Sequence, residues 1–255
     1  IAEKTCLAWT PRGEFAEVIL NGTHVGNYYL CEQIKVDENR VDIHEMEDTD
    51  TEGDAITGGY LMELDTYYDE VNKFKSSIRQ LPYMFKEPDE DVLNEQQFAY
   101  MQNYVNRLEE VLYDDAYFAI REYDKYIDID TYIDWWLVHE ITFNGEPNHP
   151  KSSYMHKDKG GKLKAGPVWD FDWGTFIRMD FFTIQHSLYY TRLLQDRSFV
   201  ELAKQRWKMY VEEFRKVPDY IRTEAERIRN SEQLNHEMWP ITQIVNKDEK
   251  MSFDD

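Results

Sequence analysis

The sequence predicts an α+β fold: a β-rich N-terminal part, residues 1–90, is followed by a mainly helical part, residues 91–255, that carries one β-hairpin. Three patterns predict it. Apolar and aromatic residues come in short strand-like runs before residue 90, apolar residues recur at helical spacing after Asp91, and a strand-like pattern returns at 152–172. A chain of 255 residues with 42% hydrophobic residues has enough apolar material to bury a core.

The N-terminal part is predicted to consist of strands and turns. The runs EFAEVILNG and THVGNYYLCEQI meet at Asn21-Gly22, a dipeptide typical of tight hairpin turns. After the acidic loop EMEDTDTEGD, Gly58-Gly59 leads into the strand YLMELD, and the short strand YMFKEP ends at Pro88. We expect these segments to form an antiparallel sheet.

The C-terminal part is predicted to consist of amphipathic helices around a hairpin. Apolar residues from Phe98 to Leu112 follow the helical period, and DIDTYIDWWLVHEI is a second helix with Asp128 or Asp130 as its N-cap. SSYMHKD and KLKAGPVWDFD form the hairpin, and two further helices cover about 196–215 and 218–234, with Pro218 at the first position of the last one. The second helix should bury Tyr132, Trp135, Trp136 and His139 or its neighbours.

The composition restricts the classes of partner. A formal net charge of −21 argues against a general nucleic-acid binder and against docking on an anionic membrane, and no apolar run approaches the length of a membrane span. A phosphorylated ligand would therefore need a bound cation or a local basic pocket. The two cysteines, Cys6 and Cys31, cannot form a zinc site alone, and they pair only if adjacent strands bring them together.

The strongest candidate for a site is the pair Asp170 and Asp172 in GPVWDFDWGTF. On a strand these two carboxylates would share one face in apolar surroundings, where like charges repel. One interpretation is a solvent-exposed strand end. The other is a pair that shares a divalent cation, and hard oxygen ligands suit Mg²⁺, Mn²⁺ or Ca²⁺, whereas no Cys/His cluster favours zinc.

A second candidate is the loop FNGEPNHPKSSY, residues 143–154. Because a hairpin folds its two ends together, this loop and the aspartate pair should be neighbours. The alternative is a purely structural polar loop. The loop contributes Asn144, Glu146, Asn148, His149 and Lys151.

The basic group that a phosphate needs is expected from Lys86 on the last N-terminal strand, paired with Glu32 or Glu63.

Several of these segments together resemble the CotH (spore coat protein H) kinase-like family, with bacterial, envelope-type members. The segments are EVILNGTHVGNYYLCEQI, GGYLMELD, the helix ahead of 143–154, KLKAGPVWDFDWGTF and SEQLNHEMWP. The likeness runs from about Glu14 to Ser252. Ser252 resembles the N-cap of a helix, so we expect a domain that is clipped at both ends.

The resemblance implies an atypical protein-kinase-like fold of two lobes that binds ATP with Mg²⁺ or Mn²⁺ and transfers phosphate to a protein hydroxyl. It assigns Asp170 and Asp172 to the metal, Asp170 also to catalysis, and Glu146 to the position of the catalytic base, where the family usually has aspartate. Ser152 stands where asparagine is common. Cofactor-binding candidates are Lys86, Glu32, Lys151 and Ser152.

The two departures, Glu146 and Ser152, leave alternatives open. Besides an active phosphotransferase, the chain could be a catalytically inactive kinase-like module that binds metal, nucleotide or an envelope partner. Paired carboxylates also serve metal-dependent phosphoesterases. The family resemblance implies an extracytoplasmic or cell-surface protein and a protein substrate or envelope partner.

Overall fold

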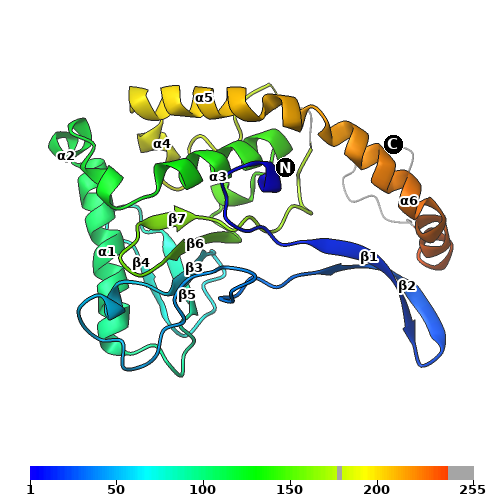
Figure 1. Cartoon of the computed structure of the whole chain (residues 1–255), viewed down its shortest axis with the longest axis horizontal. Coiled ribbons are helices and arrows are strands. Elements are labelled where there is room, and N and C mark those ends of the chain that lie inside the picture. The colour runs from blue at the N-terminus through cyan, green and yellow to red at the C-terminus, as the bar shows by residue number, and fades with distance from the viewer. Residues whose placement is uncertain (177–179, 241–255) are drawn as a thin grey trace. The chain divides into compact units, whose positions relative to one another are not determined.

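A five-stranded antiparallel sheet is the larger of the two sheets in the computed structural model, which describes residues 1–176 and 180–240 (Figure 1). The strand order is β4-β5-β3-β6-β7, so β3 is central and pairs with β5 on one side and β6 on the other. Strands from both sides of residue 90 therefore share one sheet. Their bounds are β3 (Tyr60–Leu64), β4 (Lys73–Lys75), β5 (Pro82–Glu87), β6 (Ser153–Lys157) and β7 (Leu163–Ala165).

One face of this sheet packs on helix α1 (Glu95–Tyr113) and helix α3 (Ile129–Thr142). Tyr60 of β3 stacks on Tyr100 of α1, with ring centroids 6.0 Å apart, and the Tyr132 hydroxyl of α3 lies 3.3 Å from the Met155 sulfur of β6. On the opposite face, Leu61 and Tyr154 belong to a cluster with Val41. Alternate residues of β3 thus enter different layers of the core, as the period of a strand requires.

Helices α1 and α3 both begin at a side-chain cap, and the cap of α3 is one of the two that the sequence predicts. Asn94 and Gln97 form a capping box at the start of α1, and the Asp128 side chain accepts a hydrogen bond from the Thr131 N–H at the start of α3. Tyr132, Trp135, Trp136 and His139 are all buried. Helix α3 ends at Phe143, whose φ of 55° turns the chain into the loop that follows.

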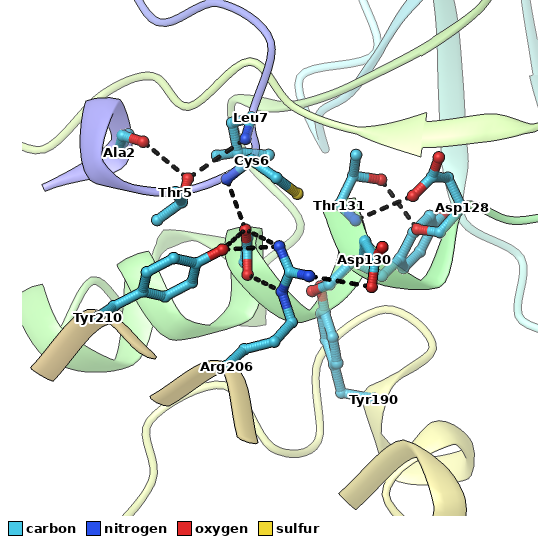
Figure 2. A network of polar contacts seen from close by, with 12 residues as sticks. Ala2, Thr5, Cys6, Leu7, Asp128, Asp130, Thr131, Tyr190, Arg206 and Tyr210 are labelled. Carbon is cyan, nitrogen blue, oxygen red and sulfur yellow. Dashed lines mark hydrogen bonds and ion pairs between the residues drawn. The ribbon is translucent and has the colours of Figure 1, made fainter. Parts of the chain in front are cut away.

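A buried ion pair fastens helix α5 (Arg197–Phe214) and the N-terminal segment to α3. The Asp134 carboxylate is completely buried and accepts hydrogen bonds from Arg206 (2.5 and 2.6 Å), from the Tyr210 hydroxyl (2.9 Å) and from the Cys6 N–H (2.7 Å). Figure 2 shows Arg206, Tyr210 and Cys6 converging from different parts of the chain. Burial, with help from Asp134, raises the pKa of the Cys6 thiol to about 12, which disfavours the reactive thiolate.

The chain divides into two compact units. The core unit comprises 1–11 and 34–212, and the hairpin unit comprises 12–33 and 213–255. In the hairpin unit, β1 (Gly13–Leu20) and β2 (Thr23–Cys31) turn at Asn21-Gly22, where both residues have positive φ as a tight hairpin requires. Helix α6 (Val217–Met238) contacts β2, and one of the contacts is a hydrogen bond from the Asn27 N–H to the Asn235 side chain.

These observations confirm the predicted α+β class with antiparallel sheets, but they differ from the sequence analysis in detail. Strands β1 and β2 form a sheet of their own instead of joining β3 to β5. Strand β7 ends at Ala165, because Pro167 cannot donate to a ladder, and residues 166–172 are irregular. Pro218 is the second residue of α6, and Ser252 lies outside the described residues.

Shorter elements complete the fold. They are η1 (Ala2–Lys4), η2 (Ala55–Thr57), α2 (Asp115–Ala119), η3 (Glu122–Lys125), η4 (Glu146–Asn148) and α4 (Tyr190–Leu193). Cys6 and Cys31 are free thiols. Within the described ranges no helix is long and apolar enough to cross a membrane.

Candidate functional site

A cavity of about 700 Å³ in the core unit collects side chains from three separate stretches of sequence. The topology of the sheet explains why. Leu64 at the end of β3 pairs with Ser153 at the start of β6, and the chain that leaves β7 passes the same place, since the Gly166 N–H bonds to the Tyr154 carbonyl. The lining residues are Asp65, Thr66, Tyr67, Glu146, His149, Lys151, Ser152, Asp170, Asp172 and Trp173.

The aspartate pair lies in this cavity, although it is not on a strand. Asp170 has a φ of 61°, in the left-handed region, and its carboxyl lies within hydrogen-bonding reach of the Asp172 carboxyl. The Ser152 hydroxyl donates to Asp170 Oδ2 at 3.0 Å. Burial raises the pKa of Asp170, and the neighbouring Asp172 carboxyl raises it further. Two neighbouring carboxylates repel each other, and a shared proton or a cation between them would relieve that repulsion.

Asn144 joins the loop to the aspartate pair. Its completely buried amide accepts a hydrogen bond from the Glu146 N–H (3.0 Å) and donates one to the Asp170 carbonyl (2.9 Å). The expected proximity of loop and aspartates is therefore present, through a residue to which the sequence analysis gave no particular role. Left-handed backbone at a non-glycine residue is unfavourable, so Asp170 needs such external support.

Glu146 is the first residue of η4 and is 7% exposed. Burial raises the pKa of Glu146, and the charge of Asp170 raises it further, while Lys151 and His149 act in the opposite direction. A carboxylate with a raised pKa is a stronger base than an exposed one. Position and environment thus suit Glu146 to accepting a proton inside the cavity.

The segment after β3 forms a wall of the cavity that sequence reasoning did not find. The Asp65 carboxylate accepts hydrogen bonds from the N–H groups of Tyr67 (2.7 Å) and Ser152 (3.1 Å), which ties this segment to the start of β6. Lys151 Nζ lies 4.2 Å from the centre of the Tyr67 ring, a cation–π contact. The signal that was available is the acidic residue placed directly after a buried strand.

The remaining predicted residues lie elsewhere. Lys86 of β5 pairs with Glu63 of β3 (3.5 Å) and with Glu70, and it is not among the residues that line the cavity. Lys86 therefore has Glu63 as its expected partner, but the lysine that lines the cavity is Lys151. Glu32 belongs to the hairpin unit, where its carboxylate accepts the Arg12 N–H, so its role at a nucleotide stays a prediction.

The donor set fits a hard divalent cation. Asp170, Asp172 and the Ser152 hydroxyl offer oxygen ligands only, and the close carboxyl pair would be stabilised by a positive ion. Among the described residues no group of three or more histidine, cysteine, aspartate and glutamate side chains is gathered as a ready metal cage. Mg²⁺ needs no such cage, because it is usually held by one or two carboxylates together with substrate phosphates and water.

The fold and the cavity define an α+β protein with a pocket of carboxylates, one lysine and exposed aromatic rings. A family model described as CotH kinase protein matches residues 6–252, nearly the whole chain. The chain therefore belongs to the CotH kinase family. No curated protein matches the sequence.

Proposed function

We propose that this chain is an atypical protein kinase of the CotH type, which transfers phosphate from ATP to a protein hydroxyl with the help of a divalent cation. The observation that carries the proposal is the convergence of Glu146, Asp170 and Asp172 on one cavity in a member of the CotH kinase family. A two-lobed, kinase-like arrangement and an extracytoplasmic or cell-surface location belong to the same proposal.

Each residue of the cavity has a separate role in this proposal. Asp170, Asp172 and Ser152 would hold Mg²⁺ or Mn²⁺, and the cation, when bound, would offset the carboxylate charge and attract phosphate oxygens. Glu146 takes the proton of the acceptor hydroxyl. The Asn144 side chain binds both the Glu146 N–H and the Asp170 carbonyl and so fixes these two segments relative to each other.

Two kinds of contact remain for the nucleotide. Lys151 is the cation that the cavity offers to a phosphate. Tyr67 and Trp173 are 74% and 59% exposed, and they present ring faces on which a purine base can stack. The cavity thus combines polar contacts for phosphate with apolar contacts for the base.

The first test is the metal dependence of ATP binding. A triphosphate that approaches Glu146, Asp170 and Asp172 is repelled unless a cation intervenes. Calorimetry should therefore detect ATP binding with Mg²⁺ or Mn²⁺ and none in EDTA, and Asp170→Asn or Asp172→Asn should remove most of it. Asp42→Asn, at an exposed carboxylate outside the cavity, is the matched control. Binding of equal strength without metal would refute this site.

The second test is phosphate transfer. Radiolabelled ATP is incubated with the chain, alone and with casein-like protein, and incorporation is measured for wild type, Asp170→Ala and Glu146→Gln. Wild type should incorporate label, and the Asp170 variant should not. Equal incorporation by both would show that the reaction does not use Asp170.

One observation favours a second function, that of a catalytically inactive kinase-like binding module. The Ser152 hydroxyl stands where the family commonly has asparagine and donates to Asp170 Oδ2, and Glu146 replaces the usual aspartate. Metal-dependent ATP binding without any incorporation would support this function. Hydrolysis of a phosphate ester without ATP would instead indicate a metal-dependent phosphoesterase.

A further inference from the structure

His139 is a buried histidine without a polar partner. It lies in the last turn of α3, is 2% exposed, and within the described ranges neither Nδ1 nor Nε2 has a hydrogen-bond partner. Burial lowers its pKa to about 3, so the ring is neutral at physiological pH. Burying two ring nitrogens without partners is costly, and an apolar side chain of similar size would avoid that cost.

The ring of His139 contacts two aromatic rings. Trp135, one turn earlier in α3, has its ring centroid 3.9 Å away, and Phe171 stacks on the His139 ring at 5.1 Å with an angle of 27° between the planes. Phe171 stands between Asp170 and Asp172 in the sequence. The buried imidazole therefore supports, through one ring contact, the residue that joins the two carboxylates of the cavity.

Other contacts also hold this turn. Asn144 binds the Asp170 carbonyl, Ser152 binds the Asp170 carboxylate, and the Thr175 hydroxyl donates to the Phe171 carbonyl at 2.8 Å. The stack on His139 is the described contact of the Phe171 ring with α3, and it holds the side chain that lies between the two carboxylates in the sequence. Because Asp172 is exposed, it has less packing of its own to fix it.

We propose that His139 is a positioning residue for the Asp170–Asp172 pair and that it acts through its stack on Phe171. The inference rests on the proposed function, in which this pair holds the divalent cation. The imidazole supplies a flat aromatic surface and no charge, so it takes no part in proton transfer. A ring at position 139 keeps the pair oriented, and a side chain without a ring releases it.

Mn²⁺ binding to the full chain tests the proposal without any activity assay. His139→Ala should weaken Mn²⁺ binding about 10-fold, the size expected when a residue behind a metal ligand is lost. His139→Phe should keep wild-type affinity and raise the melting temperature, since it retains the stack and removes two unpartnered nitrogens. Leu137→Ala, at a buried position of the same helix, is the control for general loss of packing and should bind Mn²⁺ as wild type does.

Each outcome decides a different question. Failure of wild type to bind Mn²⁺ would overturn the proposed site, and the inference with it. Wild-type binding combined with unchanged affinity in His139→Ala, or equal losses in the Ala and Phe variants, would overturn the inference alone. If His139→Ala does not fold, Mg²⁺ should still shift the His139 ring-proton resonance of the wild-type chain, and an unchanged resonance would refute the coupling.

Discussion

Replacing Asp134 by asparagine should destabilise the protein strongly, because the substitution leaves Arg206, whose side chain is 11% exposed, without its buried counter-charge. Breaking a buried ion pair by removing one partner costs about 3–5 kcal/mol. Arg206 keeps a second ion pair with Asp130 at 3.1 Å, so we expect the lower end, about 3 kcal/mol, or about 6 °C of melting temperature for a chain of this size.

The assay is urea unfolding followed by circular dichroism, and Asp130→Asn provides the matched control. The Asp130 side chain is 55% exposed, so the loss of its ion pair with the same arginine should cost below about 1 kcal/mol. The double variant Asp134→Leu/Arg206→Met should be more stable than Asp134→Leu alone, because it removes the stranded charge. Equal effects of Asp134→Asn and Asp130→Asn would refute this reasoning.

The same ion pair predicts a dependence on pH. Burial alone would raise the pKa of Asp134, but the hydrogen bonds from Arg206, Cys6 and Tyr210 outweigh this effect and hold the pKa below its usual range. A lowered carboxyl pKa stabilises the fold above the pKa of the unfolded chain, and this stability is lost as pH falls through the folded value. The wild type should therefore lose stability below about pH 4 by an increment that Asp134→Asn lacks.

Three further predictions concern other residues. Burial lowers the pKa of Lys157 from 10.5 to about 8, so between these two pH values the unfolded chain binds more protons than the folded chain does. Urea unfolding should therefore show a free energy of unfolding that rises with pH across this window, and the Lys157→Met variant should lack this rise. Gly59 has a φ of 110°, and a Cβ there would lie 2.4 Å from the His44 carbonyl oxygen, so Gly59→Ala should lower the free energy of unfolding by more than about 3 kcal/mol. Gly53 has open space around it, so Gly53→Ala should lower it by about 1 kcal/mol. Asn144→Ser should lower Mn²⁺ affinity about 10-fold, since it removes the donor to the Asp170 carbonyl, and unchanged affinity would show that Asn144 only fills space.

Sequence reasoning worked best where the determining interactions are local. Asn21-Gly22 sets its own turn, and Asp128 caps its own helix, so both were predictable from neighbouring residues. The meeting of the 143–154 loop with the aspartates was also predictable, because a hairpin brings its two ends together. The contacts that realise it, from Asn144 and Ser152 to Asp170, agree with that expectation.

The parts that were missed depend on pairing between distant segments. Asp65 and Tyr67 reach the cavity only because β3 pairs with β6, and nothing in the sequence near either strand specifies this partner. The strand expected through Asp172 stops early, since Pro167 interrupts the ladder and Asp170 adopts left-handed backbone. Lys86 pairs with Glu63, one of its two expected partners, and with Glu70, and its role as a phosphate ligand stays a prediction.

The pairing of β3 with β6 also has a consequence for synthesis on the ribosome. Tyr60 pairs with Lys157, so the central strand of the sheet emerges about 100 residues, or about 5–20 s of translation, before its second neighbour. During that interval one edge of β3 has backbone groups with no permanent partner, and such edges attract other chains. Completion of the sheet brings Asp65 and Ser152 together in the same step, so a nascent chain that has not closed its sheet cannot yet have assembled the cavity.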